Sequence, residues 1–223
     1  MCSASSPISR EHVIVGWDQV RSSYDRVAGK YEARFLGELS GKPRDRELLD
    51  AFATAVGDPV VEVGCGPGQI GAYVRAHRRR VVGADMSVAM ATRARRRLDA
   101  AFVADMQSLP LATGAAAGLL AFYSLIHLRR RDVDGVLREF ARVLRPGGRV
   151  LFSVREGQGE TEVEEFLGEA VRVSVTFFNL DELVAATRAA GLEIVLAERR
   201  APYAIESERF RLYVEARRPA PAS

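Results

Sequence analysis

Residues 60–71 read VVEVGCGPGQIG, and this stretch decides the fold. Four residues typical of a buried strand lead directly into a loop that carries Gly64, Gly66 and Gly68. Glycine has no Cβ atom, so such a loop can turn sharply and let its backbone approach a ligand closely. The stretch therefore predicts a strand followed by a ligand-binding loop, and it leaves a dinucleotide, a phosphate or another molecule open as the ligand.

Strand and helix patterns alternate around this loop. Buried strands are predicted at residues 60–63, 81–84, 101–104, 118–125 and 149–154, and helices at residues 69–77, 88–98 and 132–144. Parallel strands need crossover connections, and these crossovers place helices on both faces of the sheet. The chain is therefore predicted to adopt an α/β fold around a parallel sheet.

The N-terminal part is predicted to be helical. Residues 16–39 have apolar and aromatic side chains three or four positions apart, among them Tyr24 and Tyr31. Residues 45–56 have the same spacing and end at a Gly-Asp-Pro sequence. We expect a helical extension to precede the first strand of the sheet.

The last third of the chain has a different pattern. Residues 155–166 are polar and are predicted to form an exposed insertion, and residues 171–178 alternate like an edge strand. A helix is expected at residues 180–190. The strands expected at 192–199 and 210–216 leave no room for a helix between them, so they should form an antiparallel hairpin.

The composition narrows the class of protein. With 223 residues of which 48% are hydrophobic, the chain can form one good core. No stretch of 18 apolar residues and no signal-peptide pattern occurs, so we expect a cytoplasmic protein with no membrane partner, as a monomer or homodimer. Its 32 Lys and Arg nearly balance its 29 Asp and Glu, and we expect no nucleic-acid partner. Three scattered histidines and two cysteines predict no metal site.

Three carboxylates mark the carboxyl ends of the first three strands. In an open parallel sheet ligands bind beyond these ends. Asp85 suits the vicinal hydroxyls of a ribose, and Asp105 suits the amino group of an adenine ring. Glu62 precedes the glycine loop, where a carboxylate repels a pyrophosphate and attracts an ammonium group.

These acids favour one ligand over the alternatives. The glycine spacing differs from the G-x-G-x-x-G of dinucleotide sites, and the chain lacks the G-x-x-x-x-G-K-[ST] phosphate loop. A ligand that carries an ammonium group, a ribose and an adenine is S-adenosylmethionine. The sequence therefore predicts a site for this cofactor.

Four motifs in order resemble a known family. VVEVGCGPGQIG, VVGADMS, VADMQSLPL and VLRPGGRVLFSV are similar to the successive motifs of class I S-adenosylmethionine-dependent methyltransferases of the small-molecule type-11 group. The resemblance covers nearly the whole chain. It implies a Rossmann-like seven-stranded sheet in the order 3-2-1-4-5-7-6, with strand 7 antiparallel.

The resemblance also implies a domain organisation. It places a flexible tail at residues 1–10, an N-terminal helical cap at 11–45 and the methyltransferase domain at 46–218. An acceptor-side insertion would occupy about 155–180.

The family pattern further implies roles for individual residues. Gly64, Gly66 and Gly68 would pass beneath the methionine part of the cofactor, Asp85 would bind the ribose, and Asp105 would bind the adenine amino group. The complete set expected to bind the cofactor is Tyr24, Tyr31, Glu62, Gly64, Cys65, Gly66, Gly68, Asp85, Met86, Asp105, Met106 and Tyr123.

The expected activity is methyl transfer to a small hydrophobic or aromatic molecule, and secondary metabolism is the expected setting. His127 follows the fourth strand and is the candidate general base, since the pKa of histidine lies near neutrality. Packing at a helix start is the alternative role for it. Phe166, Phe177, Phe178 and Tyr203 are the candidate acceptor-binding residues. A cyclase or isomerase that keeps the cofactor without net methyl transfer is the alternative activity.

Overall fold

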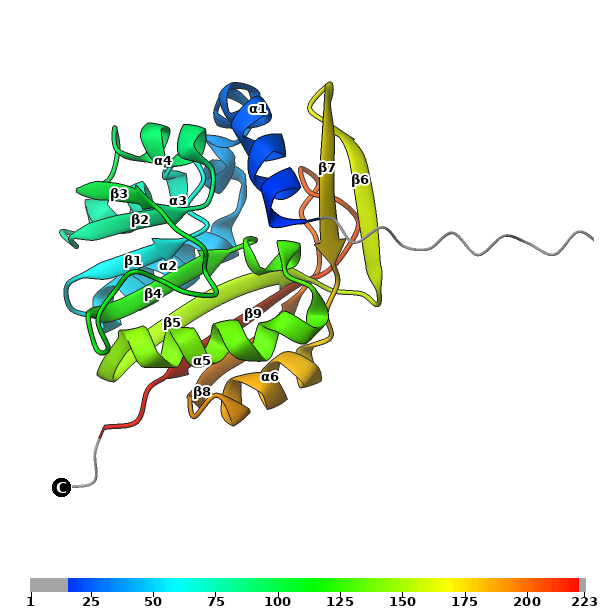
Figure 1. The fold of residues 1–223 in the computed structure, drawn as a ribbon. Helices are drawn as coiled ribbons and strands as arrows, with labels where there is room; N and C mark the ends of the chain where they lie inside the picture. The colour runs from blue at the N-terminus through cyan, green and yellow to red at the C-terminus, as the bar shows by residue number, and fades with distance from the viewer. Residues whose placement is uncertain (1–15, 221–223) are drawn as a thin grey trace, which may run out of the picture.

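The computed structural model describes residues 16–220, and its centre is a seven-stranded sheet (Figure 1). The strands lie in the order β3-β2-β1-β4-β5-β9-β8. Their bounds are β1 (Val60–Val63), β2 (Val81–Asp85), β3 (Ala100–Val103), β4 (Ala116–Phe122), β5 (Leu144–Arg155), β8 (Glu193–Arg200) and β9 (Arg211–Arg217). The first five are parallel, and β9 runs antiparallel to both of its neighbours. The expected strand order and the antiparallel last strand are confirmed.

Helices cover both faces of the sheet. They are α1 (Trp17–Phe35), α2 (Pro43–Ala55), α3 (Gln69–Ala76), α4 (Val88–Ala94), α5 (Val133–Val143) and α6 (Leu180–Ala189). One core cluster packs α5 and α6 against one face, and a second packs α2 and α3 against the opposite face. Within the described residues, no helix is both long enough and apolar enough to cross a membrane.

The two clusters follow from the alternation of side chains along each strand. Leu119 and Leu120 are neighbours on β4 but belong to opposite clusters, and so do Val150 and Leu151 on β5. Successive side chains of a strand point to opposite faces. Strands that are apolar at every position are therefore buried on both sides, as the sequence predicted for a parallel sheet.

Several element ends differ from the sequence prediction. The strand expected to reach residue 125 ends at Phe122, and the helix expected to reach residue 39 ends at Phe35. The helix expected to reach residue 98 ends at Ala94, and Leu98 lies buried in the turn that follows. Strand β5 begins at Leu144, five residues earlier than expected, because Leu144 already pairs with Ala116 before a register shift.

The segment expected to be an exposed insertion and an edge strand is a β-hairpin. Strands β6 (Glu160–Phe166) and β7 (Glu169–Thr176) pair with each other in a separate two-stranded sheet. Val171 and Val173 of β7 pack against Val20 and Val27 of α1, beside which Figure 1 shows the hairpin. An isolated hairpin is only marginally stable in water, so contact with α1 supplies its apolar support.

The N-terminal cap is described only in part. The tail at residues 1–10 and the first residues of the cap lie outside the described part of the chain. Helix α1 and a short 3₁₀ helix at Glu38–Gly41 occupy the rest of the cap and lead into α2.

Candidate active site

The glycine loop lies between β1 and α3, against the ends of two neighbouring strands. Gly64 has a φ of 66°, and a Cβ added there would collide with the side chain of Ser124 after β4. The amide of Gly66 donates a 2.8 Å hydrogen bond to Oδ2 of Asp85, the last residue of β2. At position 64, only glycine tolerates both the positive φ and the close approach to Ser124 without strain.

A cavity opens at the carboxyl ends of the strands, and we name it the inner cavity. Most of the residues expected to bind a cofactor line it: Tyr24, Tyr31, Gly64, Gly66, Asp85, Met86, Asp105, Met106 and Tyr123. They come from α1 and from the segments that follow β1, β2, β3 and β4. The fold therefore brings together side chains that are up to about a hundred residues apart in sequence.

Asp85 is held in place by backbone amides. Its Oδ1 accepts a 2.8 Å hydrogen bond from the amide of Ser87, in addition to the bond from Gly66. Burial raises its pKa to about 6, although these two bonds favour the ionised form. The fixed carboxylate faces the inner cavity and can accept further hydrogen bonds from a ligand.

Three of the residues expected to bind the cofactor do not line the inner cavity. Glu62 is buried, accepts a 2.9 Å bond from the amide of Gly71, and has a pKa raised to about 8 by burial. Cys65 is buried, and a Cβ on Gly83 would lie only 2.7 Å from its sulfur. Gly68 begins α3 with a φ of 86°. Cys65 shapes the loop by packing against Gly83, and Gly68 shapes it by turning the chain into α3. Glu62 connects β1 to α3 through its bond to the amide of Gly71.

A second cavity adjoins the first, and we name it the outer cavity. Its volume is about 670 Å³, and Tyr24, Tyr31 and Tyr123 line both cavities. Its apolar wall includes Phe166 of the hairpin, whose ring stacks on Phe35 of α1 at 6.2 Å between centroids. A cavity of this size is typical of small-molecule sites.

Of the four residues expected to bind the acceptor, only Phe166 lines the outer cavity. Phe177 and Phe178 lie in the hydrophobic core with 7% and 1% of their surfaces exposed, because the chain turns inward between β7 and α6. The ring of Tyr203 packs under the guanidinium of Arg200, and its hydroxyl accepts a bond from the amide of Arg44. Tyr203 instead holds a loop whose next residues, 204–207, line the cavity.

His127 forms a pair with Tyr24 at the edge of the inner cavity. Its Nδ1 lies 2.9 Å from the carbonyl oxygen of Ser174, so this nitrogen carries the proton and donates. Its Nε2 then accepts the proton of the Tyr24 hydroxyl, at 2.6 Å. Burial lowers the pKa of His127 to about 4, so the ring is neutral at physiological pH.

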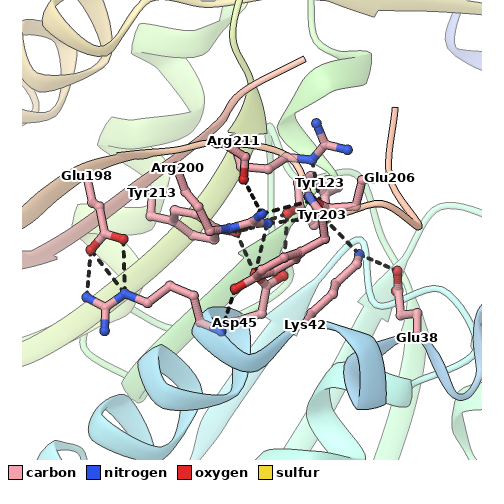
Figure 2. Close-up of polar contacts among 12 residues, drawn as sticks. Glu38, Lys42, Asp45, Tyr123, Glu198, Arg200, Tyr203, Glu206, Arg211 and Tyr213 are labelled. Atoms are coloured by element: carbon pink, nitrogen blue, oxygen red, sulfur yellow. Dashed lines mark hydrogen bonds and ion pairs between the residues drawn. The ribbon is translucent and has the colours of Figure 1, made fainter. Parts of the chain in front are cut away.

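A buried polar network lies behind Tyr123 (Figure 2). Asp45 of α2 is fully buried and accepts a 2.5 Å bond from the Tyr213 hydroxyl of β9. Arg200 donates to Tyr213, to Asp45 and to both oxygens of Glu206. The network joins α2 and the 201–210 loop to the end of the sheet.

Tyr123 connects this network to both cavities. Its φ of 54° is unusual for a residue with a side chain, and its amide donates to the carbonyl of Ser153 on β5. Its hydroxyl lies 3.4 Å from both Asp45 and Tyr213. Tyr123 therefore has a strained backbone conformation at the point where the two cavities meet.

The sequence prediction missed Trp17, Ser124 and Arg155. Trp17 lines the inner cavity from the first turn of α1, and Ser124 bonds the carbonyl of Val63. Arg155 lines the outer cavity from the last position of β5. A signal for Arg155 was present, because it is a charged residue at the carboxyl end of a buried strand, like Asp85 at the end of β2.

The fold and the site define a class. The sheet order, the glycine loop after β1 and the carboxylates at the carboxyl ends of β2 and β3 together form the architecture of class I S-adenosylmethionine-dependent methyltransferases. Residues 60–148 match the family model described as methyltransferase domain. The chain therefore carries a methyltransferase domain of the class I fold, as the sequence motifs predicted.

The curated relatives show the similarity in sequence. The malonyl-[acyl-carrier protein] O-methyltransferase of Serratia marcescens is 30% identical over 155 residues, which make up 69% of this chain and 56% of that protein. The chain spans about half the length of the curated relatives it matches.

Two solved structures share the fold. The 1,6-didemethyltoxoflavin-N1-methyltransferase of Burkholderia thailandensis, with S-adenosylhomocysteine bound, has a TM-score of 0.69 and 22% identity, covering 97% of this chain and 93% of that one. The [4+2]-cyclase SpnF has a TM-score of 0.62 and 18% identity, covering 89% of this chain and 97% of that one.

Within residues 16–220 there is no group of three or more His, Cys, Asp or Glu side chains placed to hold a metal ion.

Proposed function

We propose that the protein transfers a methyl group from S-adenosylmethionine to a small molecule. The observation that carries this proposal is the junction of the two cavities at Tyr24, Tyr31 and Tyr123. A cofactor in the inner cavity and an acceptor in the outer cavity would meet at these three rings. The match to the methyltransferase domain family supports the same reaction.

The inner cavity fits the proposed cofactor. Asp85 offers a fixed carboxylate for ribose hydroxyls, Asp105 offers one for the adenine amino group, and Met86 and Met106 offer apolar surfaces for the ring. Glu62, which is buried beside the loop and lines the adjoining outer cavity, would favour the ammonium group. When bound, the cofactor supplies an electrophilic methyl group on a sulfonium.

The residues of the protein would contribute position and exclusion of water. Methyl transfer depends on holding the nucleophile near attack distance in a dry site. Tyr24 and Tyr31 cover the junction from α1, with their ring centroids 6.2 Å apart. His127 fixes the Tyr24 hydroxyl, and the Nε2 lone pair that a general base would use is already engaged. We therefore assign His127 a positioning role.

The acceptor is proposed to be a small molecule with a hydrophobic or aromatic part, of the kind made in secondary metabolism. The rings of Tyr31, Phe35 and Phe166 form one wall of the outer cavity and support this choice. The similar proteins described above are named for methylation at oxygen and at nitrogen. The atom that is methylated depends on the acceptor and not on these rings.

Calorimetry with S-adenosylhomocysteine tests the cofactor part of the proposal. The wild-type protein should bind it, and Asp85→Asn should bind it at least about tenfold more weakly, since a charge-assisted hydrogen bond contributes about 1.5–3 kcal/mol. Asp134→Asn, which removes an exposed carboxylate from the first turn of α5, is the matched control and should bind like the wild type. No binding by the wild-type protein would refute the proposal.

Product analysis with a library of acceptors tests the transfer itself. Methyl transfer releases one S-adenosylhomocysteine for each acceptor that gains the mass of a methylene group. Conversion of a substrate with S-adenosylmethionine present but with no S-adenosylhomocysteine formed would instead support the cyclase or isomerase activity.

A further inference from the structure

Arg155 is a cation without a partner in the wall of the outer cavity. Its Nε is buried and makes no hydrogen bond. Across residues 16–220, no carboxylate, carbonyl or aromatic ring pairs with its guanidinium. The side chain ends β5, so the sheet delivers it to the cavity from a rigid element.

The charges around Arg155 do not compensate it. The charged group that acts most strongly on the pKa of the Arg155 guanidinium is another cation, Arg211, and the hydroxyls of Tyr24, Tyr31 and Tyr123 also act on it. Burial and Arg211 both lower the pKa of the Arg155 guanidinium, which means that its charge is disfavoured where it stands.

The other buried cations near this cavity have carboxylate partners (Figure 2). Lys42 lies 2.6 Å from Glu38, and Arg200 and Arg211 both contact Glu206. Arg200 also pairs with Asp45. The three cations of this network therefore face three carboxylates, those of Glu38, Asp45 and Glu206. The network is balanced within itself and has no negative charge to spare for Arg155.

Glu62 is a further carboxyl group in the wall of the outer cavity. Burial raises its pKa to about 8, so it is largely protonated at neutral pH in the protein alone. It makes no ion pair with Arg155 among the contacts of the described residues. Arg34 also lines this cavity without a carboxylate partner, but it is exposed and lies over the ring of Phe35. Among the described cations of the cavity wall that are not exposed to solvent, Arg155 is therefore the one without a counterion.

A buried charge is costly unless it is paired, and a guanidinium presents a fork of donors that matches a carboxylate. We propose that the methyl acceptor is an organic anion, and that its carboxylate or similar oxyanion group pairs with the guanidinium of Arg155 in the outer cavity. The apolar part of the anion would lie along Phe35 and Phe166. This inference rests on the proposed methyl transfer and specifies its substrate class.

The carboxylate of the cofactor's methionine part is another anion of the same chemistry. We assign the Arg155 pair to the acceptor because Arg155 is absent from the lining of the inner cavity and from the groups that shift the pKa of Glu62, the carboxyl group proposed to meet the cofactor's ammonium group. If Arg155 paired with the cofactor's carboxylate, Arg155→Met would bind S-adenosylhomocysteine more weakly than the wild type. If Arg155 pairs with the acceptor, this affinity should stay the same.

The test uses Arg155→Met and Arg155→Lys, with Arg138→Met as control. Arg138 is exposed on α5, so this variant removes the same charge away from both cavities. Arg155 has no partner to lose, so Arg155→Met should fold, with a thermal midpoint equal to or above that of the wild type. All four proteins should bind S-adenosylhomocysteine with dissociation constants within about threefold of one another.

Binding is then measured by thermal shift on proteins saturated with S-adenosylhomocysteine. The probes are pairs that differ in one group, such as 4-hydroxybenzoate with 4-hydroxybenzamide and cinnamate with cinnamide. At least one acid should raise the midpoint of the wild type and of Arg138→Met more than its amide does. Arg155→Met should lose this difference, and Arg155→Lys should keep part of it.

Turnover gives the second measurement. For the best anionic acceptor, kcat/KM should fall about 100-fold in Arg155→Met, mostly through KM, and about tenfold in Arg155→Lys. Acids that stabilise the wild type no better than their amides would overturn the proposal. So would a loss of S-adenosylhomocysteine affinity in Arg155→Met, which would assign the pair to the cofactor. Failure of the wild type to bind S-adenosylhomocysteine is a separate result that rejects the methyltransferase function itself.

Discussion

The hydrogen bond between His127 and Tyr24 bears on whether His127 acts as a general base or as a positioning residue. A general base needs a free lone pair and a pKa near the working pH. The Nε2 of His127 accepts the Tyr24 proton, and the pKa of the ring is lowered to about 4. An acceptor whose methylated atom is itself deprotonated or carries a free lone pair needs no base, and for such an acceptor the positioning role of His127 is sufficient.

We expect His127→Gln to keep turnover with an anionic acceptor. As a base, His127 would contribute roughly 10²–10⁴-fold to kcat. As a positioning residue, its loss should lower kcat less than about tenfold and weaken cofactor binding instead, because Tyr24 loses its acceptor. Steady-state kinetics between pH 6 and 9 distinguish the two roles, and a collapse of kcat that Tyr24→Phe does not reproduce would restore the general base.

The same substitution should change the pH dependence of stability. The folded pKa of about 4 lies below the ordinary value of 6.5, so the unfolded chain takes up this proton first as the pH falls. The histidine therefore costs stability progressively from about pH 6.5 down to pH 4. The free energy of unfolding of His127→Gln, measured by urea titration, should improve relative to the wild type between pH 7 and 5. A constant difference would mean that His127 is not buried as a neutral ring.

Glu62 should release a proton when the cofactor binds. Its pKa of about 8 keeps it largely protonated at pH 7 in the protein alone, and an adjacent ammonium group would ionise it. Calorimetry in two buffers of different ionisation enthalpy should show release of up to roughly one proton with S-adenosylhomocysteine. Glu62→Gln should bind more weakly and release none. Equal proton release by both proteins would separate Glu62 from the ammonium group.

At the scale of elements, helix α1 is tied to the cofactor-side helix α4 by one carboxylate. Asp25 accepts bonds from the Ser87 hydroxyl at 2.5 Å and from the amide of Ala89 at 3.0 Å. Ser87 in turn caps α4 by accepting a bond from the amide of Met90. Because Asp25 holds the turn directly after Asp85, the position of α1 and the shape of the ribose side of the cavity are coupled.

We expect Asp25→Ala to weaken S-adenosylhomocysteine binding about tenfold while destabilising the protein by only about 1 kcal/mol, the typical loss of a helix cap. Asp18→Ala removes an exposed carboxylate from the same helix and should change neither quantity. Calorimetry and urea unfolding measure the two effects. Unchanged affinity in Asp25→Ala would show that α1 does not shape the cofactor site.

The sequence predicted elements whose signals are local and missed those that depend on distant contacts. Residues 60–63 became β1 as expected, because a run of apolar residues before glycines is a local pattern. The hairpin of β6 and β7 was not predicted, since the buried valines of β7 find their apolar partners on α1, about 150 residues earlier in sequence. For the same reason Phe177 and Phe178 were taken for cavity residues, although the inward turn after β7 buries them.

For the whole molecule, the network around Asp45 sets how firmly the outer cavity is closed on its C-terminal side. Asp45 joins α2 to β9 through Tyr213 and to β8 through Arg200. These elements come from opposite ends of the chain, and the loop between β8 and β9 carries residues 204–207 into the cavity wall. Loss of Asp45 would therefore act on the fold and on the cavity together.

Asp45→Ala should be strongly destabilising. It leaves Arg200 and Tyr213 buried with fewer partners, and breaking a buried ion pair from one side costs about 3–5 kcal/mol. Asp50→Ala on the same helix is the matched control. Its carboxylate bonds Tyr73 and His77 near the surface, so its loss should cost about 1 kcal/mol or less.

Urea unfolding at pH 7 compares the two variants, and Asp45→Asn, which keeps the volume but not the charge, should fall between them. If Asp45→Ala and Asp50→Ala lost the same free energy, the network would be marginal to the fold. The strained backbone of Tyr123 would then be held mainly by its bond to the carbonyl of Ser153. The part of the outer cavity wall formed by residues 204–207 and Arg211 would need another support.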